Sequence, residues 1–160
     1  MRLSNRQLLL AVCLLSLTLA IGGALLAYFL GLAACPLCIV QRMLYLLLAL
    51  FAAGALLVHS RTGMRRLFTA AMTAVAAGGI FVAGYQAWLQ RFAPPNTTCA
   101  GNLPWWERFV YWAGERVSLL FQASGLCSDP AWKFLGLSLA EWSLAAFALL
   151  TLAALQAVRR

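Results

Sequence analysis

The chain has 160 residues, of which 64% are apolar and only 10% are charged, with a net charge of +8. Soluble domains carry about 25% charged residues, so a chain this poor in charge could not cover its own surface in water. The composition excludes disordered and low-complexity classes, and the mean hydropathy of +0.86 indicates a surface that faces lipid. The length predicts a single integral membrane domain covering residues 1–160.

Four apolar runs are long enough to cross a bilayer as helices. They cover residues 8–30, 39–58, 67–89 and 139–158. We therefore expect an all-α membrane protein built as a bundle of four transmembrane helices. The pairs Gly22-Gly23 and Gly78-Gly79 lie within the first and third runs, where small residues let membrane helices approach closely.

The basic residues predict the orientation of these spans. Seven of the twelve lie on one side, at Arg2, Arg6, Arg61, Arg65, Arg66, Arg159 and Arg160. The connections on the other side, 31–38 and 90–138, carry four. The positive-inside rule then predicts both termini in the cytoplasm and both connections in the periplasm of a bacterial inner membrane. Charges scattered in this way do not form the basic face that nucleic acid binding requires.

Four of the five cysteines fall on the predicted outer side, with Cys35 and Cys38 in the short connection and Cys99 and Cys127 in the long one. Because this side is oxidising, we expect disulfides between Cys35 and Cys38 and between Cys99 and Cys127. A C-x-x-C pair is often reactive. Two structural staples are the alternative. A four-thiolate zinc site is a weaker one, since the second pair is widely spaced.

Other uses of the cysteines are disfavoured. Haem attachment would require His after Cys38, where the chain has Ile39, and the only histidine, His59, falls on the opposite side. Lipoprotein cleavage before Cys35 is disfavoured because the preceding apolar run is too long for a signal core. Cys13 lies within the first span and is interpreted as a small packing residue.

The local sequence favours activation of Cys38. Pro36 suits the first position of a helix, so Cys35 would cap the second span and Cys38 would lie in its first turn, where thiolates are stabilised. Arg42 follows four residues later on the same helix face. A cation in an apolar span is costly, which favours a functional role, and an interfacial anchor that reaches the headgroups is the alternative.

The long connection has a pattern of its own. Residues 104–123 have the spacing of a short amphipathic helix. A position flat in the membrane interface is indicated by its aromatic residues, Trp105, Trp106, Tyr111 and Trp112. Before it, Pro94-Pro95 and Asn96–Thr98 predict an extended, mobile stretch that exposes Cys99 to a partner protein.

Together these features resemble the bacterial disulfide bond formation protein B (DsbB) family over nearly the whole chain. The resemblance rests on the four spans, the two cysteine pairs, and the motifs Cys35–Arg42, Ser124–Cys127, Trp132–Leu137 and Glu141-Trp142. It implies a membrane thiol oxidase that reoxidises a soluble periplasmic dithiol oxidase of thioredoxin fold, DsbA-like, and passes two electrons to a membrane quinone.

The resemblance also implies residue roles. Cys99 would form the mixed disulfide with the DsbA-like partner, and Cys127 would resolve it through exchange with Cys35. Cys38, as a thiolate, would then reduce the quinone, with Arg42 stabilising the thiolate or the quinone oxygens.

Further positions concern the electron acceptor. Gln90 matches a family residue near the quinone, and a polar interfacial side chain is the alternative. Some members have His one turn earlier, where this chain has Gln86, so a proton-donating role of that His does not carry over. The sequence does not distinguish ubiquinone from menaquinone, and neither metal nor haem is expected.

A loop-stapling membrane protein and a small transporter are the alternative functions. The transporter is weaker because the third and fourth spans have no ionisable residue at mid-span.

Overall fold

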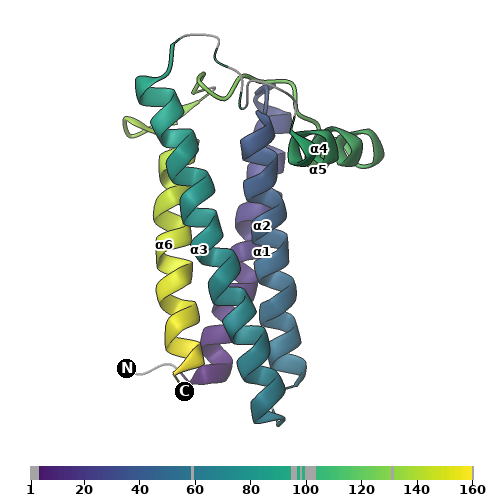
Figure 1. Cartoon of the computed structure of the whole chain (residues 1–160), viewed down its shortest axis with the longest axis vertical. Coiled ribbons are helices and arrows are strands. Elements are labelled where there is room, and N and C mark those ends of the chain that lie inside the picture. The colour runs from purple at the N-terminus through teal and green to yellow at the C-terminus, as the bar shows by residue number, and fades with distance from the viewer. Residues whose placement is uncertain are drawn as a thin grey trace.

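The computed structural model describes residues 4–58, 60–94, 97, 99, 104–130 and 132–159. Within them, four long helices form a bundle (Figure 1): α1 (Asn5–Phe29), α2 (Pro36–Leu57), α3 (Thr62–Phe92) and α6 (Leu139–Val158). Each is long and apolar enough to cross a membrane. The prediction of a four-helix membrane bundle is confirmed, and the chain is a multi-pass membrane protein.

The helix ends follow local capping signals. Ser4 and Ser138 begin α1 and α6 with capping boxes, each completed by a side chain three residues later. The helix α3 has 31 residues and extends past its predicted span, 67–89, at both ends. At 1.5 Å per residue it measures about 46 Å, against about 30 Å for the bilayer core.

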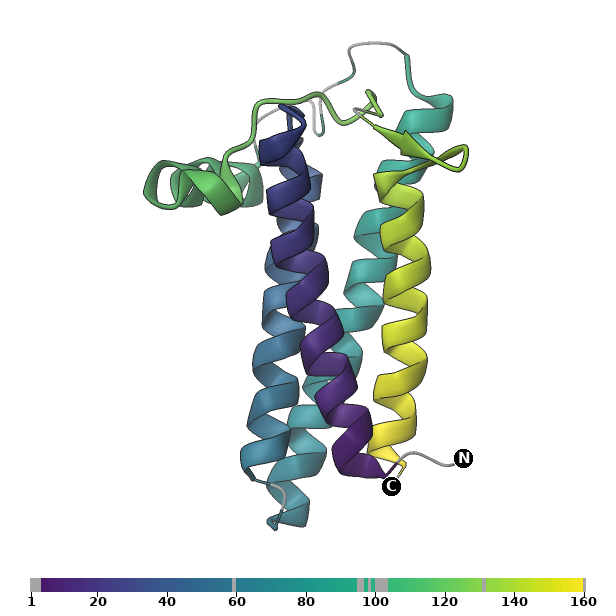
Figure 2. The ribbon, with the colours of Figure 1, turned by 180° about the vertical axis from the view of Figure 1, so that it is seen from behind.

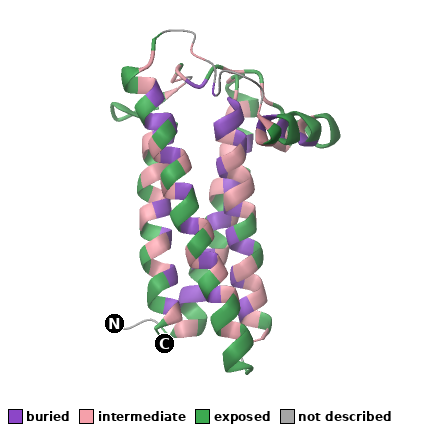
Figure 3. Ribbon diagram, in the orientation of Figure 1, coloured by how far each residue is buried: buried purple, intermediate pink, exposed green. Residues whose placement is uncertain are grey.

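The four helices do not pack evenly around the bundle. The helix α2 packs against both α1 and α3, and α6 packs along α3, whereas α1 and α6 contact each other much less. Figure 2 shows that α1 and α6 converge at the end where α1 begins and separate toward the other end. The core is apolar, with Leu48, Met72 and Phe147 fully buried. Exposed residues lie on the outside of the bundle (Figure 3), and many of them are large and apolar, as a lipid-facing surface requires.

The glycine pairs play different roles. At Gly79 an added side chain would overlap the ring of Phe147, so this position does allow the close helix approach that the sequence predicts. A Cβ at Gly78 would meet open space. For Gly22 and Gly23 the prediction of close packing is wrong: both line a cavity between helices.

The long connection folds as two short helices and a hairpin. The helices α4 (Trp105–Arg116) and α5 (Ser118–Phe121) lie beside α1 and α2 near one end of the bundle and project sideways from it (Figure 1). The strands β1 (Lys133–Phe134) and β2 (Leu137–Ser138) pair antiparallel, with Lys133 opposite Ser138. They lead directly into α6.

The prediction of one helix over residues 104–123 is wrong. The chain leaves the helical conformation at Val117, with φ −135° and ψ 74°. It then turns back so closely that a Cβ on Gly114 would lie 2.7 Å from the carbonyl oxygen of Phe121. The apolar spacing continues through this break, which is why periodicity alone did not reveal it. The aromatic face of α4 is exposed, with Trp105, Phe109 and Trp112 at least half exposed.

The start of α1, the end of α6 and the connection between α2 and α3 all lie at one end of the bundle, as an even number of spans requires (Figure 1). The remaining connections lie at the opposite end. Several residues used in the sequence predictions fall outside the described residues, namely Arg2, His59, Pro95, Asn96, Thr98 and Arg160.

Candidate redox site

The first cysteine pair lies at the start of α2. Cys35 is the N-cap residue and Pro36 the first helical residue, as predicted, and the Cys35 Sγ accepts a hydrogen bond of 3.3 Å from the backbone N–H of Cys38. The two sulfurs lie 2.9 Å apart as free thiols, so the pair is adjacent but does not form the disulfide that we expected. The pKa of Cys35 is raised well above its usual value, first by its hydrogen bond with Cys38 and second by burial.

A buried amide from α3 contacts both sulfurs. The Gln86 Nε2 donates to the Sγ of Cys35 at 3.2 Å and to that of Cys38 at 3.0 Å. Sequence reasoning noted Gln86 only as a departure from a family pattern and missed this contact. The available signal was a polar residue one turn before Gln90 in an apolar helix.

Arg42 connects three helices. It extends from α2, where its Nη1 donates to the carbonyl oxygen of Leu120 and its Nη2 to that of Gly23, each at 3.0 Å. These carbonyls belong to α5 and α1, so two peptide groups of the protein solvate the guanidinium. This arrangement differs from an anchor that extends to lipid headgroups. Arg42 and Cys38 line the same cavity.

The second cysteine pair is a disulfide. Cys99 and Cys127 are bonded, with Cα atoms 5.0 Å apart, which confirms the predicted pairing. Cys99 is 3% exposed and Cys127 fully buried, so the expectation of an exposed Cys99 is wrong. The disulfide is covered because it packs in one buried cluster with Cys35 and Leu89, against which Trp106 of α4 also packs.

Little of the predicted mobile stretch before Cys99 is described. Within it, the Thr97 hydroxyl donates to the carbonyl oxygen of Pro94 at 2.6 Å, and the Ser128 hydroxyl donates to that of Thr97 at 3.3 Å. The second contact ties this stretch to the residue that follows Cys127.

Backbone contacts hold the second loop on the first. The backbone N–H groups of Ser124 and Gly125 both donate to the carbonyl oxygen of Ala34, at 2.9 and 3.0 Å. A side chain on Gly125 would overlap the backbone oxygen of Ala33. We call these contacts the backbone latch. It fixes the segment just before Cys127 on the segment just before Cys35, so both cysteine pairs lie in one buried region.

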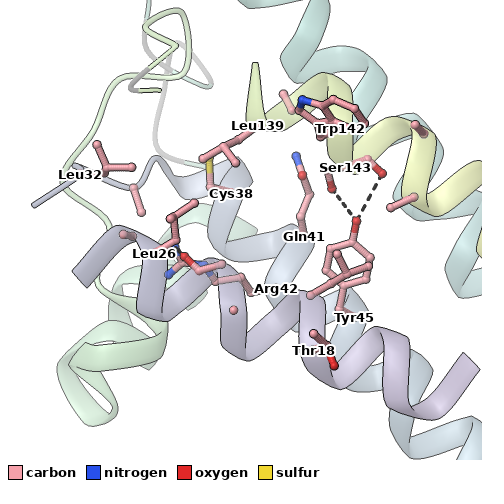
Figure 4. Close-up of a pocket in the computed structure, with 18 of the residues that line it drawn as sticks. Thr18, Leu26, Leu32, Cys38, Gln41, Arg42, Tyr45, Leu139, Trp142 and Ser143 are labelled. Atoms are coloured by element: carbon pink, nitrogen blue, oxygen red, sulfur yellow. Dashed lines mark hydrogen bonds between the residues drawn. The ribbon is translucent and has the colours of Figure 1, made fainter. Parts of the chain in front are cut away.

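A cavity of about 480 Å³ lies between α1, α2 and α6, where α1 and α6 separate. This volume is typical of sites for small molecules. Its walls are mostly apolar, and Figure 4 shows Cys38 and Arg42 toward one end and Tyr45 with Ser143 toward the other. The hydroxyl groups of Tyr45 and Ser143 are hydrogen-bonded at 2.7 Å. Of the described cysteines, Cys38 alone lines this cavity.

Gln90 lies elsewhere. It lines a much smaller cavity, of about 20 Å³, together with Cys35, Cys38 and Gln86. Its Oε1 is buried without a hydrogen-bond partner. Gln90 thus approaches the cysteines from α3 and does not line the large cavity.

The fifth cysteine, Cys13, lies within α1. The Cys13 thiol donates to the backbone oxygen of Ala49 at 3.6 Å and packs against the bundle core, as predicted for a packing residue. In the described part of the chain, no group of three or more His, Cys, Asp or Glu residues is arranged to hold a metal ion.

The chain is similar to known proteins over nearly its whole length. The family model for disulfide bond formation protein DsbB matches residues 5–157. A disulfide bond formation protein B from Pseudomonas syringae pv. tomato is 40% identical over 146 residues, covering 88% of this chain and 80% of that protein. One from Albidiferax ferrireducens is 31% identical over 157 residues, covering 98% and 89%. This chain therefore belongs to the DsbB family, whose members support disulfide bond formation in bacteria.

Proposed function

We propose that this protein is an inner-membrane thiol oxidase that reoxidises a periplasmic DsbA-like dithiol protein and passes the electrons to a membrane quinone. One observation carries the proposal. Cys35 packs in the same buried cluster as the Cys99–Cys127 disulfide, and Cys38, which packs against that cluster, also lines the large cavity. The sulfur atoms thus form a path from the loop to a cavity in the apolar part of the bundle.

The first exchange takes place at the loop pair. A thiolate of the reduced partner attacks Cys99 and forms a mixed disulfide, and Cys127 leaves as a thiolate. The Cys127 thiolate is then available for exchange with Cys35, and the second thiolate of the partner attacks the partner sulfur that is bonded to Cys99 and releases Cys99. The partner ends as a disulfide and the loop pair as a dithiol. Because Cys99 is covered in the structure, docking of the partner has to uncover it first.

The second exchange moves the electrons to α2. The Cys127 thiolate attacks Cys35 in a Cys35–Cys38 disulfide and releases Cys38 as a thiolate, and Cys99 then displaces Cys35. This restores the Cys99–Cys127 disulfide and leaves Cys35 and Cys38 reduced. Closing the Cys35–Cys38 disulfide again releases two electrons and two protons, which convert one quinone to a hydroquinone.

The large cavity fits a quinone, in the volume and the apolar character of its walls. A quinone ring also needs hydrogen-bond donors for its carbonyl oxygens, and Arg42 and Tyr45 supply donors in the cavity wall. A bound quinone supplies the two-electron acceptor. Arg42 holds a positive charge near Cys38 and stabilises the negative charge that develops there.

The reaction is tested with the purified protein in detergent, a reduced thioredoxin-fold dithiol protein and a soluble quinone. We expect one quinone to be reduced for each partner disulfide formed, measured by quinone absorbance and thiol titration. A protein whose disulfides only staple its loops would neither oxidise the dithiol nor reduce the quinone. That result would overturn the proposal.

We also propose that both termini face the cytoplasm, so that the cysteine end of the bundle faces the periplasm. The seven basic residues on the terminal side support this orientation. Reporter fusions after Arg66 and after Cys99 should report opposite sides. A periplasmic signal after Arg66 would place the cysteines in the reducing cytoplasm and contradict the relay.

A further inference from the structure

The side-chain amide nitrogen of Gln86 lies within hydrogen-bonding distance of two sulfur atoms. The residue is 1% exposed, and its Nε2 lies 3.2 Å from the Sγ of Cys35 and 3.0 Å from that of Cys38. A sulfur that carries negative charge is the stronger acceptor of such bonds, and the buried surroundings strengthen them further.

A second glutamine fixes the orientation of the first. The Gln41 Nε2 donates to the Gln86 Oε1 at 2.6 Å, and Gln41 is itself only 5% exposed. Because the Gln86 oxygen is held on this side, its NH2 group is directed toward the two sulfurs. Gln41 lies on α2 between Cys38 and Arg42, so this helix carries both the reacting sulfur and the group that orients its donor.

We propose that Gln86 is a catalytic residue that stabilises the Cys38 thiolate through a neutral amide donor, and that Gln41 is the positioning residue that orients it. This inference rests on the proposed function, in which Cys38 reacts as a thiolate. An amide keeps both hydrogens at every physiological pH, unlike an imidazole, so the donor needs no proton of its own to be effective. Gln86 is also absent from the described lining of the large cavity, so it acts on the sulfur and not on a molecule bound there.

Alkylation of Cys38 tests the donor without quinone or partner. A Cys13→Ala, Cys35→Ser background leaves Cys38 as the free thiol beside the loop disulfide, and Ser keeps an acceptor at the N-cap of α2. In this background Gln86→Met should lower the alkylation rate at neutral pH about 10-fold, the effect of losing a hydrogen bond to a charged group. Gln41→Met should lower the rate less, because the amide remains but is no longer oriented.

Two further variants separate donation from packing. Gln86→Glu keeps the size and shape of the side chain but replaces the donor by a negative charge, so it should slow alkylation more than Gln86→Met does. A residue that only fills space would instead tolerate Glu better than Met. The matched control is Gln156→Leu, which removes an exposed glutamine of α6 and should leave the rate unchanged. A Gln86→Met protein with an intact loop disulfide and an unchanged alkylation rate would overturn the inference.

Turnover distinguishes failure of this inference from failure of the proposed function. With partner and quinone present, Gln86→Met in the otherwise native chain should lower kcat and leave the KM for quinone unchanged, because Gln86 contacts the sulfurs and does not line the cavity. Slower alkylation in a protein that reduces no quinone at all would support the amide contact and refute the quinone reaction. Normal alkylation with normal turnover would refute the role of Gln86 alone.

Discussion

The two cysteine pairs are held in opposite ways. Cys35 and Cys38 are three residues apart, and one turn of helix with its N-cap brings their sulfurs to 2.9 Å. Cys99 and Cys127 are separated by 28 positions and meet through contacts between distant segments. The helical pair is therefore rigid and close to a cavity, whereas the loop pair depends on packing that a docking partner can displace. The proposed relay between water and membrane needs both kinds.

The largest effect should follow from removing any of the four paired cysteines. Single Ala replacements of Cys35, Cys38, Cys99 or Cys127 should nearly abolish quinone reduction by the partner, because each variant breaks one exchange. Steady-state quinone absorbance measures this. Cys13→Ala is the matched control and should keep full activity, since its thiol donates to a backbone oxygen of α2 and packs in the core away from both cysteine pairs. Full activity in Cys99→Ala would show that the loop pair has only a structural role.

The next largest effect should come from the backbone latch, which joins the two pairs. Gly125→Val places a side chain against the backbone oxygen of Ala33 and should push Cys127 away from Cys35. A displacement of about 1 Å between reacting groups costs roughly 100-fold in rate. Exchange of the partner with the loop pair should survive, so reduced Cys99 and Cys127 should accumulate before quinone is reduced, as seen by rapid acid quench and thiol labelling.

The control for the latch is Gly78→Ala, because a Cβ at that position meets open space on α3. It should leave both exchanges at their normal rates. If Gly125→Val reduced quinone as fast as the native chain, the latch would play no part in the exchange between the pairs.

Substitutions of Arg42 test the Cys35–Cys38 pair, because Arg42 lines the same cavity as Cys38. Arg42→Ala removes a charge near Cys38 and should leave the loop exchange intact. Quinone reduction should slow, or require more quinone, by about 10- to 100-fold if one charge contributes on the order of 1.4–2.7 kcal/mol. Arg42→Lys should be intermediate, since it keeps the charge but loses the fork that binds two carbonyls. Quinone titrations of the steady-state rate measure both, and an unchanged titration for Arg42→Ala would assign Arg42 a purely structural role.

The same contrast between local and distant contacts explains what the sequence could reveal. The spans, the cap at Cys35 and the shared face of Cys38 and Arg42 follow from periodicity and neighbours within one turn. The contact of Gln86 with both sulfurs required the packing of α3 on α2, which no local pattern encodes. The burial of Cys99 likewise depends on how the loop folds back over the bundle.

The smallest expected effect concerns the far end of the large cavity, where no sulfur lies. Tyr45→Phe removes the hydroxyl that bonds to Ser143 but keeps the ring, which stacks on Phe147 with centroids 4.2 Å apart, so the fold should be unaffected. A single neutral hydrogen bond contributes about 1 kcal/mol, which corresponds to roughly a 5-fold rise in the KM for quinone. Ser143→Ala removes the partner hydroxyl and should raise the KM similarly or less. Both variants should keep kcat at saturating quinone, because neither side chain contacts Cys38. A fall in kcat with unchanged KM would mean that this end of the cavity governs the reacting sulfur and not the position of the quinone.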